Sequence, residues 1–177
     1  LGALKKEKSR GAAAKVIEGF ARRAYRRPVM PDEVERLTGF IRLARQNGQE
    51  PVVGLKLAFK AVLVSPHFLF RVETDRSGDR PDAVYAINEF ELATRLSYFL
   101  WSSTPDEELL GLAAKGTLHA DHVLQQQVRR MLADGKSQAL VDNFFTQWLN
   151  LRLLDGVAPD PQVFPNFDGE LKAAMRR

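Results

Sequence analysis

Apolar residues recur every three or four positions along nearly the whole chain, and this spacing constrains the fold more than any other feature. After Pro31, one helical face is built from Val34, Leu37, Ile41 and Ala44. Later in the chain, the same steps connect Leu140, Phe144, Trp148 and Leu151. Such spacing is typical of amphipathic helices, and no alternating stretch typical of a β-strand persists. The sequence therefore predicts an all-α, multi-helix bundle without a significant sheet.

Capping residues mark where helices begin. Asn88 and Glu91 have the spacing of a capping box, in which each side chain accepts a hydrogen bond from the other residue's backbone amide. Ser65 followed by Pro66 predicts the N-cap and first turn of a short helix that ends near Val72. These signals place a joint between two helices at Ser65.

The helix predicted at residues 51–64 is apolar apart from Gly54, Lys56 and Lys60. The two lysines are four positions apart and form one narrow polar stripe. A helix with so little polar surface is usually covered on most sides. We therefore predict a central position for it in the core.

A polar stretch rich in turn-forming residues divides the chain at residues 74–83. We predict two small helical domains packed together with a shared or continuous core, one at residues 11–75 and one at residues 85–177. A chain of 177 residues buries roughly two-thirds of its unfolded surface, which is enough for such a core. Because the first residue is not Met and the last residues look helical, we interpret the sequence as a piece of a longer protein, with a truncated second domain.

The residue types exclude several kinds of chemistry. There is no cysteine, which excludes disulfides, zinc–thiolate sites, thiol nucleophiles and covalently attached haem within this segment. No apolar run reaches about eighteen residues, so we expect no membrane span. The glycine patterns of phosphate loops and dinucleotide sites, and the nucleophile elbow of hydrolases, are missing. We therefore expect no cofactor and no metal in this segment and assign no catalytic residue.

His67 lies between two apolar blocks, at the second position of the short helix that follows Ser65. As a functional residue it would be a metal or haem ligand, or a general base. The positive end of a helix dipole disfavours imidazolium, and no second histidine, carboxylate or cysteine lies beside His67 in the sequence. We favour a neutral His67 packed in the core and keep the functional interpretation as the alternative.

His119 and His122 are three positions apart, which on a single helix would place them on one face as a metal pair. The pair lies at a predicted helix start, where Asp121 is explained by the helix dipole. No HExxH motif and no third ligand accompany the two histidines. We therefore favour a structural interpretation of this pair.

Basic residues are concentrated at the start of the chain. Residues 1–27 hold nine Lys or Arg and two Glu, whereas the whole chain has a net charge of +4. The strongest polar feature is an arginine cluster formed by Arg22, Arg23, Arg26 and Arg27. These side chains would suit phosphates, anionic lipid or an acidic partner. We favour a solvated face, or ion pairs with the acidic remainder, because no nucleic-acid-binding module and no aromatic stacking pattern accompany the arginines.

Seven aromatic side chains are predicted to belong to the core: Phe68, Phe70, Phe99, Trp101, Phe144, Phe145 and Trp148. A binding groove between helices would use the same residue types. The aromatic residues alone therefore do not distinguish a core position from a binding groove.

Four long segments occur in a recognisable order: FARRAYRRPVMPDEVERL, AVLVSPHFLFRVE, ELATRLSYFLWSSTPDEELL and APDPQVFPNFDGELKAAMRR. Together they resemble planctomycete-type, cytochrome-c-associated proteins that carry the 1595 and 1592 domains of unknown function, in that order. The resemblance implies a large exported parent protein in the periplasm or at the cell surface. It also implies a c-type cytochrome module, with haem c, elsewhere in that parent, and it implies no catalytic residues here.

These observations leave three hypotheses for function. The leading one is a structural or interaction module of a large exported, redox-associated bacterial protein, which docks other domains of the parent chain, among them a cytochrome c module. The second is one wall of an active site completed by downstream domains, with His67, Arg71 or the lysine stripe facing a cleft. The third is binding of an anion or a nucleic acid through the arginine-rich first helix. We favour an anion over a nucleic acid as that ligand.

Overall fold

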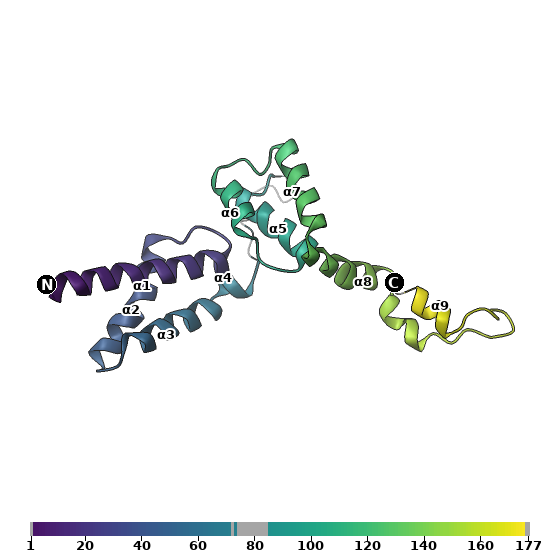
Figure 1. Ribbon diagram of the computed structural model, residues 1–177, viewed down its shortest axis with the longest axis horizontal. Helices are drawn as coiled ribbons and strands as arrows, with labels where there is room; N and C mark the ends of the chain where they lie inside the picture. The colour runs from purple at the N-terminus through teal and green to yellow at the C-terminus, as the bar shows by residue number, and fades with distance from the viewer. Residues whose placement is uncertain (1, 72, 74–84, 176–177) are drawn as a thin grey trace.

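All regular elements of the described residues are helices, which confirms the all-α prediction. The computed structural model describes residues 2–71, 73 and 85–175 (Figure 1). The α-helices are α1 (Gly2–Tyr25), α2 (Pro31–Gln46), α3 (Pro51–Leu63), α4 (Pro66–Leu69), α5 (Glu89–Trp101), α6 (Glu107–Ala114), α7 (Asp121–Ala133), α8 (Thr146–Trp148) and α9 (Gly169–Ala174). Between them lie two 3₁₀ segments, η1 (Gly135–Ser137) and η3 (Leu151–Gly156), and a π-helical segment, η2 (Leu140–Phe145). The divide predicted at residues 74–83 lies outside the described residues.

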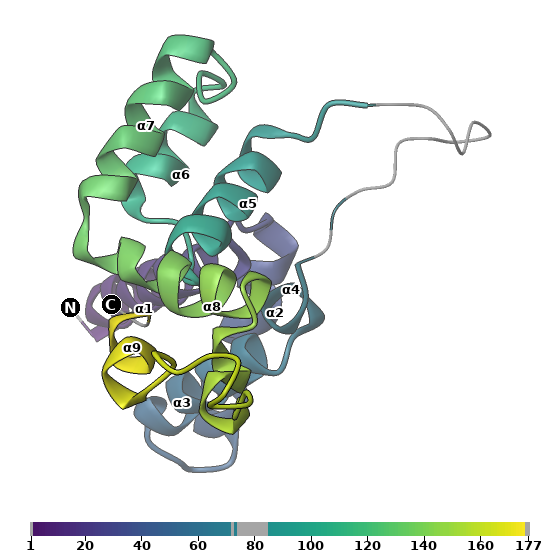
Figure 2. The same ribbon diagram turned by 90° about the vertical axis from the view of Figure 1, so that its right-hand side faces the viewer.

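Two separate clusters of buried side chains replace the shared core that the sequence predicts. The first joins α1, α2 and α3 through Ile17, Ala21, Ala24, Tyr25, Leu37, Ile41, Ala58 and Val62. The second joins α5, α6 and α7 through Ala93, Leu100, Trp101, Leu109, Ala113, Leu118 and Met131. The short α4 follows α3 and packs against α1, and the two bundles lie next to each other with separate cores (Figures 1 and 2).

The predicted central position of α3 is wrong, because this helix buries one face only. Gly54, Ala58 and Val62 are buried against the neighbouring helices. On the opposite face, the side chains of Val52 and Leu63 are 52% and 42% exposed. The three helices of the first bundle pack around one cluster of buried side chains, and within the described residues the outer face of α3 stays exposed.

The backbones of α2 and α3 approach each other closely at Gly54. A β-carbon at this position would lie 2.4 Å from Ile41 Cα and 2.6 Å from the carbonyl oxygen of Phe40. Both neighbours are backbone atoms of a helix, which cannot move aside as a side chain can. Glycine at position 54 therefore sets the distance between the two helices.

The predicted caps at Asn88 and Ser65 are confirmed. Asn88 Oδ1 accepts a hydrogen bond from the Glu91 amide at 2.9 Å, and Glu91 Oε2 accepts one from the Asn88 amide at 2.7 Å. Ser65 Oγ accepts from the His67 amide at 3.3 Å and begins α4. These local bonds determine where α4 and α5 start, and both helices border the groove described below.

Arg26 connects the end of α1 to α4. Arg26 follows the last turn of α1 and has a φ of 58°. This left-handed backbone conformation costs free energy for any residue other than glycine. Arg26 as a whole is only 4% exposed. Its guanidinium donates hydrogen bonds to the carbonyl oxygens of His67 at 2.7 Å and Phe70 at 2.8 Å. Longer bonds reach the carbonyl oxygens of Ala24 and Phe68, at 3.1 and 3.3 Å. A single buried side chain therefore holds the backbone of α4 against α1.

We expect Gly54→Ala to lower the free energy of unfolding by about 2–3 kcal/mol, because the new methyl group forces α2 and α3 apart. Gly39→Ala is the matched control, since a β-carbon there meets no atom within 4 Å. Removing glycine from an open helical position should raise stability by up to about 1 kcal/mol. Urea unfolding followed by far-UV circular dichroism measures both changes. Equal changes in the free energy of unfolding for the two substitutions would contradict a close approach of α2 and α3 at Gly54.

We expect Arg26→Ala to lower the free energy of unfolding by about 3 kcal/mol, because buried carbonyl groups lose their donor. Arg23→Ala, at an exposed position of α1, should change it by less than about 0.5 kcal/mol. Arg26→Gly should recover only about 1 kcal/mol of backbone strain relative to the alanine variant. Chemical denaturation of the three variants tests this, and coincident curves for Arg26→Ala and Arg23→Ala would contradict it.

Candidate functional site

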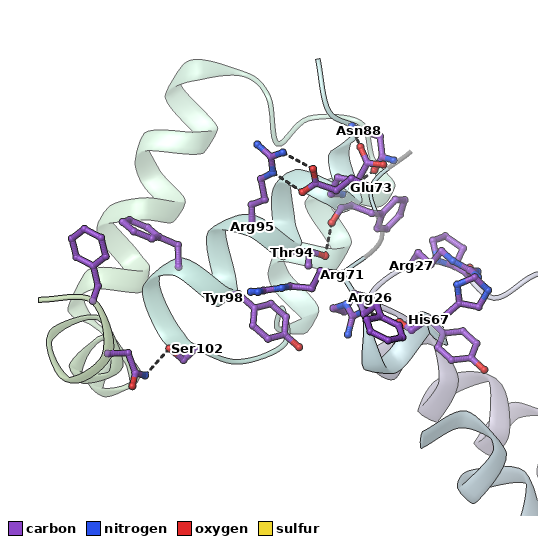
Figure 3. A pocket seen from close by; sticks show the side chains of 18 of the residues that line it. Arg26, Arg27, His67, Arg71, Glu73, Asn88, Thr94, Arg95, Tyr98 and Ser102 are labelled. Carbon is purple, nitrogen blue, oxygen red and sulfur yellow. Dashed lines mark hydrogen bonds and ion pairs between the residues drawn. The ribbon is translucent and has the colours of Figure 1, made fainter. Parts of the chain in front are cut away.

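A groove of about 1180 Å³ lies where the two bundles meet (Figure 3). One wall comes from the end of α1, from α4 and from the residues that follow α4. The other wall comes from α5, and η2 and α8 contribute one edge through Asn143, Phe144 and Gln147. Neither bundle forms this groove alone, so its shape depends on the contact between them.

On the first wall, Arg27 and Glu33 form a bidentate ion pair. Arg27 Nη2 lies 2.8 Å from Glu33 Oε1, and Nη1 lies 3.0 Å from Oε2. The backbone amide of Met30 also donates to Glu33 Oε2, at 2.9 Å. The hydrogen bonds from Arg27 lower the pKa of Glu33 to about 2, with the Met30 amide acting in the same direction against the effect of burial. The carboxylate of Glu33 is therefore charged at physiological pH and raises the pKa of Arg27.

His67 lies beside this ion pair, and the prediction that it is packed in the core is wrong. Its side chain is 47% exposed, and its Nε2 is 3.7 Å from Glu33 Oε1. The imidazole ring also faces Tyr25, with ring centroids 5.3 Å apart. Glu33 is 34 positions away in the sequence, which is why the neighbours of His67 along the chain show no chemical partner for it. The sequence marks Glu33 only as an acid in the first turn of a helix.

Arg71, which follows α4 on the first wall, lies over the ring of Tyr98 on α5, the second wall, with its guanidinium carbon 4.9 Å from the ring centre. This is the distance of a cation–π contact. Within the described part of the chain, no carboxylate forms an ion pair with Arg71 at 4.0 Å or less. Next to it, Arg95 Nε donates to Glu73 Oε1 at 2.6 Å, and this bond lowers the pKa of Glu73 (Figure 3). Tyr98 carries no signal in the sequence beyond its helical position.

Most of the aromatic residues predicted for the core are exposed instead. Trp101 is buried and donates from Nε1 to the Met131 carbonyl at 2.9 Å, and Phe68 packs partly against the first core. The other five are all more than a third exposed: Phe70, Phe99, Phe144, Phe145 and Trp148. For Phe144, Phe145 and Trp148 the regular four- and three-residue spacing misleads because η2 is a π-helix, whose wider turn changes the angle between successive side chains.

Two of these exposed rings, Phe99 and Phe144, line the groove, and Trp148 extends their apolar surface beyond it; the three rings form the aromatic edge. Phe99 and Phe144 contact each other edge to face, with ring centres 5.6 Å apart. Trp148 stacks on Phe144 at 5.9 Å. Since 55% of Phe99 and 66% of Trp148 is open to solvent, this aromatic edge can receive a further apolar group.

The remaining predicted site residues lie away from the groove. Arg22 forms an ion pair with Glu107 at 2.6 Å, and Arg23 is exposed on α1. His119 precedes α7 and lies 3.1 Å from Glu89, while His122 is exposed in the first turn of α7. The two histidines therefore do not share a helix face. No group of three or more metal-ligating side chains occurs among the residues that the structure describes.

The arginine cluster is divided among three structural roles. Arg22 and Arg27 form ion pairs and Arg23 is exposed to solvent, which agrees with the interpretation that we favour. Arg26 is buried, so the expectation of a solvated face is wrong for this residue. The α-helix ends at Tyr25, and Arg26 and Arg27 therefore lie beyond it and not along its surface. The four arginines do not form one basic face.

The groove is equipped for binding. Its lining includes four cations, Arg26, Arg27, Arg71 and Arg95, and two carboxylates, Glu73 and Glu91. Arg26 and the ion-paired Arg27 and Arg95 are engaged within the chain, which leaves the Arg71 guanidinium as the cation best placed to meet an anionic ligand. The Ser102 hydroxyl accepts from the Asn143 side-chain amide at 2.9 Å.

Comparison with known proteins identifies two family models along the chain. Residues 87–177, about half of the chain, match the family PSD4, described as a protein of unknown function (DUF1592). Residues 12–73 match PSD5, also a protein of unknown function (DUF1595). No curated protein and no solved structure matches the chain. The predicted pair of domain families, and their order, is confirmed.

The Glu33 ion pair predicts a specific pH dependence of stability. Because the folded state holds the pKa of Glu33 near 2, below its ordinary value of 4.5, its contribution is complete above about pH 5 and is lost as the pH falls toward 2. Glu33→Gln should be less stable at neutral pH and should show a weaker loss in this acidic range. Urea unfolding at a series of pH values measures the difference. Glu35→Gln, exposed on the same helix, is the control, and an equal response of both variants would contradict the assignment.

Proposed function

The chain belongs to the PSD4 family of proteins of unknown function (DUF1592), and we propose that it is an interaction module whose groove binds an acidic segment of another protein domain. The observation that carries this proposal is the exposed combination of Arg71, Phe99 and Phe144 on both sides of one groove. A guanidinium recognises a carboxylate, and exposed rings recognise the apolar residues beside it.

We further propose that this module works inside a large exported, redox-associated protein in the periplasm or at the cell surface. The support is the resemblance of four long segments to cytochrome-c-associated proteins of planctomycete type. Its partners would then be other domains of the parent chain, including a c-type cytochrome module that carries the haem. No helix in the described part of the structure is long and apolar enough to cross a membrane.

A second candidate function is favoured by the position of His67. A half-exposed imidazole beside a carboxylate, inside a groove, is a common arrangement for a general base. The groove would then be one wall of an active site that downstream domains complete. Lys56 and Lys60 lie on α3 and do not line the groove, so the lysine stripe does not support this candidate. His67→Asn in the parent protein would reduce substrate turnover without changing partner affinity if this candidate is correct.

The third candidate, anion or nucleic-acid binding through the first helix, has less support. Arg22 and Arg27 are paired with carboxylates, and Arg26 is buried among carbonyl groups. Arg23 alone of the four does not make an extended basic surface of the kind that tracks a phosphate backbone.

The proposed function is tested by titrating separately produced domains of the parent protein into the 177-residue chain. We expect one domain to bind, and we expect Arg71→Ala combined with Phe99→Ser to weaken its binding by more than about tenfold, since a desolvated cation and a ring contact are lost. The matched control is Arg23→Ala combined with Val52→Ser, at exposed positions outside the groove. Isothermal titration calorimetry measures the affinities, and circular dichroism checks folding. Equal weakening by both double variants would overturn the proposal.

A further inference from the structure

Residues 157–168, with the sequence VAPDPQVFPNFD, form an exposed loop between η3 and α9. Lys172 Nζ donates to the Val157 carbonyl at 2.7 Å and joins the start of the loop to α9. Within the loop, Asp160 Oδ1 accepts from the Gln162 amide at 2.8 Å, and the Asp160 carbonyl accepts from the Phe164 amide at 2.9 Å. These bonds give the loop a defined shape before it meets any partner. We refer to residues 157–168 as the acidic loop.

The acidic loop presents apolar side chains that its own chain leaves open to solvent. Val163 is 65% exposed and Phe164 is 56% exposed. The loop extends away from both bundles together with α9 (Figure 1). Exposed, closely spaced apolar residues on an ordered loop are typical of an interaction site.

The composition of the acidic loop complements the groove. The loop contains Asp160 and Asp168 and no Lys or Arg. Among the described residues that line the groove, Arg71 is the arginine that forms neither an ion pair nor a hydrogen bond to a backbone carbonyl. Phe164 offers a ring to the exposed edge formed by Phe99, Phe144 and Trp148. Opposite charge selects the partner and its orientation, and aromatic contact supplies affinity.

We propose that the acidic loop of one copy of the chain binds in the groove of a second copy. This inference rests on the proposed function, in which the groove receives an acidic protein segment, and it names that segment. Phe164 packs against the aromatic edge while a loop carboxylate meets the Arg71 guanidinium. Three prolines, Pro159, Pro161 and Pro165, restrict the loop already in the free chain, so little conformational entropy is lost on binding.

The groove and the acidic loop lie close together in the sequence, so two copies of the chain can each place a loop in the other's groove. Phe144 and Gln147 line the groove, and the chain passes directly from α8 through η3 to the acidic loop. Each copy therefore carries one receptor groove and, one short segment later, one ligand loop. A pair related by a two-fold axis fills both grooves and leaves no loop unpaired, which closes the assembly at two copies.

The first test is the oligomeric state of the 177-residue chain over a range of concentrations. We expect a monomer–dimer equilibrium in sedimentation equilibrium, weakened at least tenfold by Phe164→Asp and weakened also by added salt. Val52→Asp, which places the same charge at an exposed apolar position of α3, should leave it unchanged. A chain that stays monomeric at every concentration, or equal effects of the two variants, would overturn the proposal.

The second test uses a labelled peptide that copies residues 156–173 and so retains both ends of the acidic loop. Fluorescence anisotropy with the Phe164→Asp chain as receptor should show saturable binding. Arg71→Ala in the receptor should weaken it at least tenfold, while Arg23→Ala should change it less than about twofold. Absence of peptide binding, or equal loss in the two arginine variants, would overturn the second-copy proposal.

The two proposals fail in different ways. If domains of the parent bind in the groove and the peptide does not, the proposed function stands and the second-copy inference is overturned. If the peptide binds and no parent domain does, the inference stands and the assignment of parent domains as partners is overturned. If neither binds, both are overturned.

Discussion

The guanidinium of Arg26 makes the interaction on which the wall of the groove depends. An isolated helix of four residues such as α4 does not persist in water, so its position must come from contacts with the rest of the chain. Arg26 provides them by donating to carbonyl oxygens of His67, Phe68 and Phe70 from the end of α1. Because arginine stays protonated and carries five N–H donors, one side chain can satisfy several buried acceptors at once.

The hydrogen bonds from Arg26 to α4 also position the polar side chains of the groove. With the backbone of α4 bonded to Arg26, the His67 imidazole projects beside Tyr25 and Glu33. Arg27, the next residue, reaches the same carboxylate and keeps it ionised. Three of the groove arginines thus have partners inside the chain, and Arg71 on the Tyr98 ring presents its charge to the groove.

The apolar surfaces have a different origin. Two small cores each bury one face of their helices, and a large share of the remaining apolar side chains stays outside. The outer face of α3, the aromatic edge of the groove and the acidic loop are all exposed in this way. Apolar area of this extent on an ordered surface favours association with another protein surface, which is the common basis of the two proposals.

The sequence by itself determined that the chain is helical and where α4 and α5 begin, because the bonds that make a helix join residues within four positions of each other. The capping box of Asn88 and Glu91, the start of α4 at Ser65 and the absence of a sheet among the described residues were all predictable for this reason. Apolar spacing identifies a helix but not which of its faces is covered, so the exposure of α3 and of the aromatic edge was decided by tertiary packing. The pairs that build the site, Glu33 with His67 and Arg71 with Tyr98, join residues 27 or more positions apart. Such contacts exist only after the helices have packed, and no local pattern encodes them.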